Sequence, residues 1–284
     1  MMKSLTLKLL TSLLLSSSLL LAGDIALDKK VLDFLNKSIT TGVEYKLKNV
    51  SIVDVQDFDK IAGWKVYFVT IDLDLAGKNK TISIKDKIFT NGDIVSKDFV
   101  YMDSRKSIKD DLFVQFDQKL YKKSNLIAGQ FEAKNKLVVF SDPLCPFCMD
   151  FMPDVIDFVQ KHPKDFALFY YHFPLSMHLN SKTIVKASIV AKREGVEDVI
   201  KKVYESVFDF EKNKDDKLAL SAFNEALGTH ITLEQINKKD IIDEMQIDID
   251  AAKKLMISGT PTLYVNGKLD KQRELFANFT KEYK

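Results

Sequence analysis

The first apolar pattern in the chain is an uncharged, leucine-rich run over residues 9–23, which follows Lys3 and Lys8. This order is typical of a secretory signal peptide. A membrane anchor is the alternative, but a spanning helix needs about 20 apolar residues, and this run is shorter and is interrupted by Ser16, Ser17 and Ser18. We therefore predict that residues 1–23 are a signal peptide that is removed on export.

After this run, apolar residues recur at helical spacing from Leu27 to Leu35, which predicts a short amphipathic helix. Residues 64–75 and 81–89 then show strand-like alternation, and Asn91-Gly92 is typical of a tight hairpin turn. Residues 24–104 are thus expected to form a small α+β domain, a helix with an antiparallel sheet, without chemistry of its own.

The spacing of apolar residues changes from strand-like to helical over residues 105–130. An apolar stripe runs among charged residues at Ile108, Leu112, Phe113, Phe116 and Leu120. This spacing predicts a helical linker between two domains.

Residues 131–284 alternate between strand and helix signals, as expected of an α/β domain. A buried strand is predicted over 137–140, a helix from Cys145 to about Lys161, and a second strand over 165–173. The pattern of residues 180–256 is helical and reads as an insertion. A strand over 262–265, a turn at Asn266-Gly267 and a helix over 272–283 follow.

Composition narrows the class of partner. The 284 residues are 46% hydrophobic and 29% charged, which is typical of a soluble globular protein. Without Lys3 and Lys8 the basic and acidic residues balance, so we expect no nucleic acid partner and no binding to an anionic membrane surface.

The candidate chemistry lies at Cys145 and Cys148, the two cysteines of the chain. A bridge across two residues closes too short a loop to stabilise a fold by much. A helix amino terminus instead favours the reactive thiolate over the thiol, whose ordinary pKa is about 8.5. We expect Cys145 to attack, Cys148 one turn later to resolve the mixed disulfide, and Pro146 to fit the first helical turn.

Other interpretations of the two cysteines stay open. They could be half of a zinc site, a chance pair of buried thiols or an inert disulfide. The four histidines show no paired spacing that completes a zinc site, so no metal is expected. His178 is interpreted as a surface or capping residue, with contact with the active site as the less favoured alternative. Pro261 suits a cis bond at a strand edge that is open to a substrate backbone, although an ordinary loop proline would look the same.

The segment Val138–Cys148, VVFSDPLCPFC, resembles the Dsb-type thioredoxin-fold proteins, particularly the DsbC and DsbG branch. Pro153 stands where thioredoxins carry a proline in the motif helix. Residues 259–262, Gly-Thr-Pro-Thr, resemble the loop with the cis-proline of that fold. Residues 172–178 are similar to a segment of DsbA-like domains.

The resemblance implies a thioredoxin fold over 131–284 and a cystatin-like, dimerising domain over 24–104. It also implies a periplasmic homodimer with a redox-active Cys145–Cys148 disulfide, no other cofactor, and the active-site neighbours Pro146, Phe147, Thr260 and Pro261. The expected substrates are unfolded or misfolded exported proteins with cysteines, and a membrane redox partner is expected. A disulfide isomerase or reductase is the leading hypothesis, with a DsbA-like dithiol oxidase and a non-catalytic holdase as alternatives.

Overall fold

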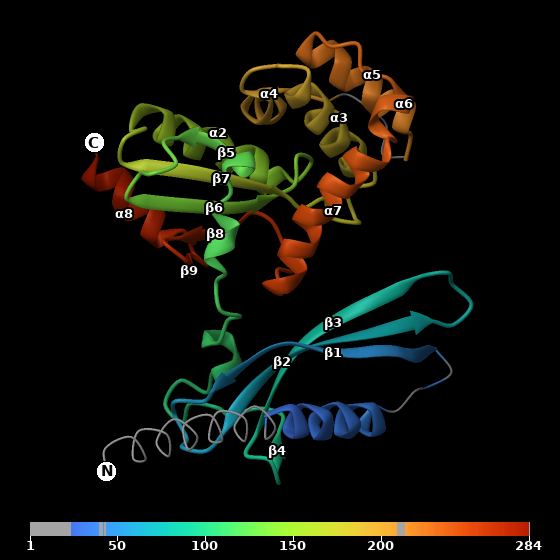
Figure 1. Cartoon of the computed structure of the whole chain (residues 1–284), viewed down its shortest axis with the longest axis vertical. Helices are drawn as coiled ribbons and strands as arrows, with labels where there is room; N and C mark the ends of the chain where they lie inside the picture. Colours follow the sequence, from blue (N-terminus) through green and yellow to red (C-terminus); the bar gives the residue numbers. More distant parts are fainter. Residues whose placement is uncertain (1–23, 40–41, 43, 209–213, 284) are drawn as a thin grey trace, which may run out of the picture. The chain divides into compact units, whose positions relative to one another are not determined.

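The protein is described by a computed structural model, which covers residues 24–39, 42, 44–208 and 214–283. The chain divides into unit 1, Met1–Val114, and unit 2, Gln115–Lys284 (Figure 1). The predicted signal peptide at residues 1–23 lies outside the described part of the chain. Within that part, the structure contains no helix with the length and hydropathy needed to span a bilayer.

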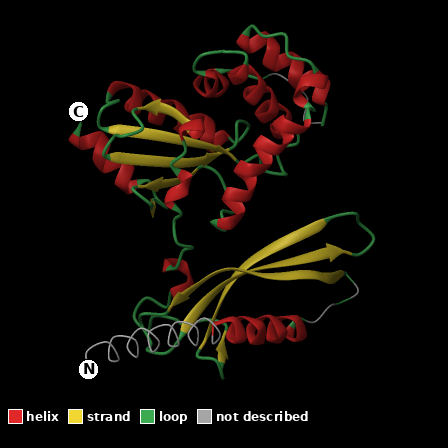
Figure 2. Ribbon diagram, viewed as in Figure 1, coloured by secondary structure: helices red, strands yellow, loops and turns green. Residues whose placement is uncertain are grey.

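Unit 1 is a helix followed by a four-stranded antiparallel meander (Figure 2). The helix covers residues 24–38, and the strands, in spatial as well as sequence order, are β1 (Tyr45–Asp57), β2 (Lys65–Leu75), β3 (Thr81–Thr90) and β4 (Val95–Ser96). Val31 and Leu35 of the helix pack with Tyr67, Val69 and Ile88 of the sheet in one buried cluster. Helix and antiparallel sheet therefore lie where the sequence predicts them, while a cystatin-like fold stays a prediction.

The predicted helical linker over residues 105–130 is wrong in its secondary structure. This range, all of it described, holds three short 3-10 turns, η1 (Ile108–Asp111), η2 (Gln118–Leu120) and η3 (Lys123–Asn125), and then strand β5 (Leu126–Gly129). Its apolar residues do not share one face, because Ile108 is buried in unit 1 whereas Leu120 is buried in unit 2. Packing into two separate cores overrides the helical spacing, and the boundary between the units falls inside the predicted linker.

Unit 2 is built on a five-stranded mixed sheet with strand order β5-β7-β6-β8-β9 (Figure 2). Its further strands are β6 (Asn135–Ser141), β7 (Phe166–His172), β8 (Thr262–Val265) and β9 (Lys268–Leu269). Helix α2 (Pro146–Lys161) joins β6 to the parallel strand β7, and β8 pairs antiparallel with β6. Nearly every residue of β6 and β7 is buried, as expected of strands covered on both faces.

A group of helices lies in the sequence between β7 and β8. These are α3 (Ser181–Arg193), α4 (Val199–Glu205), α5 (Asp216–Leu227), α6 (Leu233–Ile236) and α7 (Lys239–Lys254). They share a hydrophobic cluster of their own, which includes Ile184, Phe223 and Ile241. These helices fall in the range in which the sequence predicts a helical insertion, and α8 (Glu274–Glu282) ends the unit.

Candidate active site

Cys145 lies at the amino terminus of α2, just beyond the end of β6. It is the N-cap residue of the helix, with extended backbone angles, and Pro146 occupies the first helical position. The Cys145 amide donates to the carbonyl oxygen of Asp142 over 3.1 Å, which fixes the turn between strand and helix. A sulfur in this place faces the positive end of the helix dipole, where a negative charge is favoured.

Cys148 lies one turn further along α2 and is completely buried. Burial raises the pKa of its thiol to about 12, because the apolar surroundings disfavour the thiolate. The backbone of Asp142 and the hydroxyls of Ser141 and Thr260 act in the opposite direction on that pKa. Both cysteines are free thiols in the structure.

The loop before β8 completes the site. The peptide bond between Thr260 and Pro261 is cis, as the sequence predicts for this proline. The Cys145 sulfur lies 3.5 Å from the Thr260 carbonyl oxygen, although the two residues are 115 positions apart in the sequence. The structure therefore brings together Cys145, Cys148 and the proline loop that the sequence singles out.

Phe147, between the two cysteines, is 68% exposed. Its ring is therefore exposed, whereas the neighbouring Cys145 is only 4% exposed and Cys148 is fully buried. An apolar ring at this place can contact an unfolded polypeptide that approaches Cys145.

Asp142 is a functional candidate that the sequence reading missed. Its carboxylate is fully buried and receives four hydrogen-bonding groups: the amides of Leu144 and Leu175, at 2.8 and 2.7 Å, the hydroxyl of Ser181 at 2.6 Å, and Nδ1 of His178 at 2.8 Å. These groups come from the turn before α2 and from the segment that opens the helical insertion. His178 is thus a partner of this carboxylate rather than a plain surface residue.

A second buried polar cluster lies at the end of β7. The Asp248 carboxylate accepts from the His172 amide over 3.0 Å and from the Asn125 side chain over 3.2 Å. Burial lowers the pKa of His172 to about 3 and raises the pKa of Asp248 to about 6. Among the described residues, no three His, Cys, Asp or Glu side chains lie together in a way that could hold a metal ion.

Comparison with known families identifies the catalytic half of the chain. Residues 136–280 match the model of the DSBA-like thioredoxin domain, which covers the cysteines, the helical insertion and the proline loop. The probable disulfide bond formation protein D of Bacillus cereus is 27% identical over 153 residues, which are 50% of this chain and 69% of that protein.

Other similar proteins match between half and three fifths of the chain. The Na(+)/H(+) antiporter NhaA 1 of Mycolicibacterium vanbaalenii is 27% identical over 149 residues, 50% of this chain, and this chain spans 23% of that protein's length. Among solved structures, oxidised BdbD of Bacillus subtilis has a TM-score of 0.47 and 22% identity, over 60% of this chain and 97% of that one. The catalytic domain of Proteus mirabilis ScsC has a TM-score of 0.43 and 19% identity, over 57% and 91%.

Proposed function

Because this chain belongs to the family of DSBA-like thioredoxin domains, which are thiol-disulfide oxidoreductases, we propose that it exchanges thiols and disulfides through Cys145 and Cys148. The observation that carries this proposal is the position of Cys145. It starts α2, beside the Thr260 carbonyl of the cis-proline loop and next to the exposed Phe147, whereas Cys148 is fully buried one turn further along the helix.

The reaction proceeds by two exchanges in which sulfur–sulfur bonds are replaced one for one. The Cys145 thiolate attacks a substrate disulfide, forms a mixed disulfide and releases one substrate thiolate. Cys148 then attacks the Cys145 sulfur, which forms the Cys145–Cys148 disulfide and releases the second substrate sulfur. The substrate is reduced and the enzyme is oxidised, and the reverse sequence introduces a disulfide into a substrate. This internal disulfide is the only redox group that the proposal requires.

The proposed substrates are unfolded or misfolded exported proteins with cysteines, and the proposed location is the periplasm. The signal-like pattern of residues 1–23 supports export. Each net reduction or net oxidation of a substrate leaves the Cys145–Cys148 pair in the opposite redox state. We therefore propose that a membrane redox partner restores the dithiol or the disulfide of Cys145 and Cys148.

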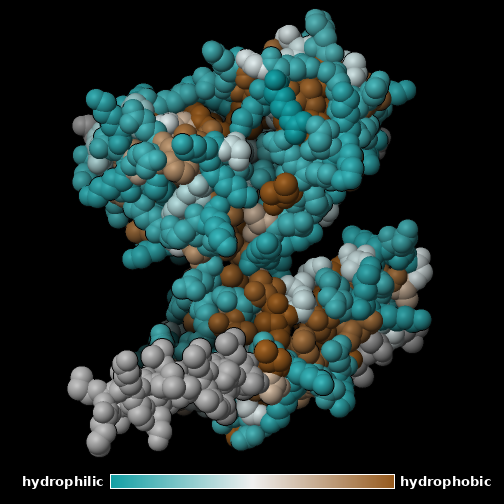
Figure 3. Space-filling model, viewed as in Figure 1, coloured by the Kyte–Doolittle hydropathy of each residue, from teal (hydrophilic) through white to brown (hydrophobic). Residues whose placement is uncertain are grey.

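Of the possible activities, we favour isomerisation and reduction of substrate disulfides. We also propose that the protein acts as a homodimer formed through unit 1. Unit 1 is a separate compact unit. It exposes large apolar side chains, among them Ile84, Ile94, Val100 and Met102, and Figure 3 shows hydrophobic surface on this unit. Such surface is typical of protein contacts, and two catalytic units in one dimer would hold a misfolded chain at two points.

A DsbA-like dithiol oxidase is the second candidate. The family model and the name of the Bacillus cereus relative favour it. Trapping Cys145 and Cys148 in cells with an alkylating probe separates the two directions, since an isomerase or reductase is held mostly as the dithiol and an oxidase mostly as the disulfide. A protein whose substrate binding persists unchanged without both cysteines, and which catalyses no exchange, would instead be a holdase and would contradict the proposal.

A further inference from the structure

The resolving step poses a chemical problem at Cys148. Only a thiolate attacks a disulfide, and the Cys148 thiol is buried in the hydrophobic cluster beneath α2. In such surroundings the negative charge is costly unless hydrogen-bond donors face it. The donors that the core can offer are therefore decisive for this step.

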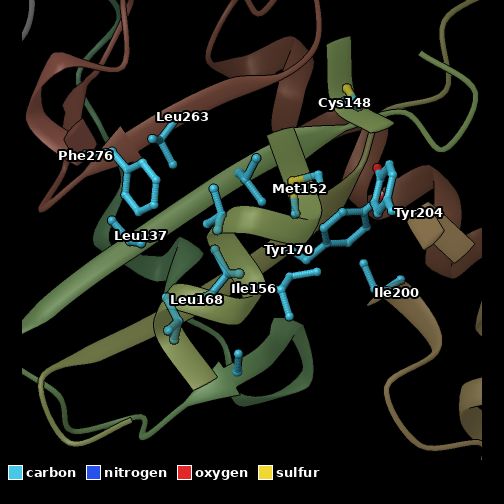
Figure 4. Packing of buried hydrophobic residues seen from close by; sticks show 14 of the residues in the cluster. Leu137, Cys148, Met152, Ile156, Leu168, Tyr170, Ile200, Tyr204, Leu263 and Phe276 are labelled. Carbon is cyan, nitrogen blue, oxygen red and sulfur yellow. The ribbon is translucent and has the colours of Figure 1, made fainter. Parts of the chain in front are cut away.

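A chain of three buried hydroxyls runs from the cluster that holds Cys148 to the end of β6. Tyr170 on β7 and Tyr204 on α4 have their hydroxyl oxygens 2.8 Å apart, and Tyr204 donates to the Ser141 hydroxyl over 2.7 Å. All three side chains are buried. Ser141 ends β6, the strand that leads into the cysteine turn, and its hydroxyl acts to lower the pKa of the Cys148 thiol, against the effect of burial. Figure 4 shows Tyr204 and Tyr170 side by side in the same cluster as Cys148.

The direction of the chain follows from its bonds. Tyr204 uses its proton on Ser141, so its oxygen is left to accept the Tyr170 proton. Ser141 then accepts from Tyr204 and keeps its own proton for another acceptor. Three hydroxyl dipoles aligned head to tail strengthen one another in a medium of low dielectric constant, and the last proton can point at the Cys148 sulfur.

We propose that Tyr170, Tyr204 and Ser141 are positioning residues that align this proton on Cys148 and stabilise its thiolate during resolution of the mixed disulfide. The overall step is balanced without an external base. Cys148–SH and the mixed disulfide give the Cys145–Cys148 disulfide and a substrate thiol, so the proton that Cys148 loses ends on the departing substrate sulfur. Tyr204 belongs to the helical insertion, which thereby takes part in the chemistry of the thioredoxin core.

This inference rests on the proposed function, and the experiment separates the two. The full protein is reduced and mixed with an excess of a peptide disulfide, and the mixed disulfide is followed by rapid acid quench and mass spectrometry across pH 6–10. We expect Tyr204→Phe to slow resolution about tenfold and to move its pH profile about one unit higher, because it removes a donor that acts on a charged group. The rate at which Cys145 first attacks stays unchanged.

Matched variants separate alignment from packing. Tyr171→Phe removes a buried tyrosine hydroxyl from the neighbouring position of β7, where it donates to the Leu120 carbonyl, away from the chain, and it should resolve at the wild-type rate. Ser141→Ala should match or exceed the effect of Tyr204→Phe, Ser141→Thr should restore resolution, and Tyr170→Phe should slow it less.

Each outcome decides one of the two proposals. A wild-type protein that forms no mixed disulfide through Cys145 would overturn the proposed function. A wild type that resolves normally, with Tyr204→Phe and Ser141→Ala equal to it in rate and pH profile, would overturn the role of the hydroxyl chain. If Tyr204→Phe loses its near-ultraviolet circular dichroism, the comparison of Ser141→Ala with Ser141→Thr carries the test.

Discussion

Among the described residues, unit 1 buries Thr90 as its one polar side chain apart from tyrosine, whereas unit 2 buries many, including Ser141, Asp142, His172 and Asp248. A buried polar group costs free energy unless it is hydrogen-bonded. Unit 1 has an apolar core between its helix and its sheet. Unit 2 keeps polar groups at the ends of β6 and β7, and the carboxylates of Asp142 and Asp248 and the hydroxyl of Ser141 are hydrogen-bonded there, whereas Nδ1 of His172 has no partner.

The cysteines should give the largest effect in this comparison. We expect Cys145→Ser to abolish all exchange, because it removes the attacking thiolate, and Cys148→Ser to accumulate mixed disulfides, because it removes the group that resolves them. Non-reducing gels with a cysteine-containing substrate measure both. Adducts that form through Cys148 in Cys145→Ser would contradict these roles.

Separating the two units should abolish the refolding of scrambled substrates but preserve the reduction of simple disulfides. A protein that begins at Gln115 keeps β5, Leu120 and the whole sheet of unit 2, whereas a start near Gly129 would cut β5. We expect residues 115–284 to be monomeric and to reduce simple disulfides at nearly the full rate, but to lose refolding of scrambled substrates. Light scattering on this form and on the mature protein tests the dimer. A monomeric mature protein at micromolar concentration would remove the basis for dimer-dependent isomerisation and favour the oxidase.

Removal of a buried polar group should destabilise unit 2 more than removal of an exposed one. Asp142→Ala leaves the amides of Leu144 and Leu175 without their acceptor, so we expect a loss of about 3 kcal/mol. Asp157→Ala breaks a half-exposed ion pair with Lys201 in the same unit and should cost less than about 1 kcal/mol. Urea unfolding of both variants measures the difference, and equal losses would show that the Asp142 network stabilises no more than a surface pair.

The last expected effect is on the pH dependence of the stability of unit 2. The pKa of His172, about 3 in the folded protein, lies below its ordinary value near 6.5, so its contribution to stability is present above pH 6.5 and is lost as the pH falls towards 3. The slope is at most about 1.4 kcal/mol per pH unit. His172→Gln should flatten the dependence of the unfolding free energy on pH in this window.

Asp248 should change the pH dependence of stability in the opposite direction to His172, and it therefore serves as a control. Its pKa is raised to about 6, so its contribution is present below about pH 4 and is lost as the pH rises through 6. Asp248→Asn should therefore steepen the rise of stability with pH between 4 and 6. Urea unfolding at pH 4, 5, 6 and 7 measures both slopes, and a change of the same sign in the two variants would contradict the assignment.

Local patterns predict much of the catalytic unit. Strands β6 and β7 are continuous apolar runs, α2 begins at the cysteine motif, and the turn chemistry after β8 is visible at Asn266-Gly267. The contact of Cys145 with the Thr260–Pro261 loop agrees with what the resemblance to thioredoxin-fold proteins implies.

The roles of Asp142, Ser141 and Tyr204 could not be predicted in this way. Each role depends on a hydrogen-bond partner in another element. The spacing of residues in the sequence does not indicate which partner a single aspartate or tyrosine will contact. Tyr204 meets Ser141 across 63 positions of the sequence. The prediction of a helical linker was wrong for a related reason, because the spacing of apolar residues does not show which of two cores will bury each side chain.

The insertion between β7 and β8 also sets the order in which the site is assembled. Strand β6 needs β8 as its antiparallel neighbour, and that strand follows five helices later in the chain. Contacts between distant segments form late, since the intervening loop must first be ordered. In a chain that emerges from its amino terminus, Cys145 therefore appears before the carbonyl of Thr260 can cover its sulfur. Until the last strands arrive, a nascent copy carries an unshielded dithiol and is open to the same disulfide errors that it is proposed to repair.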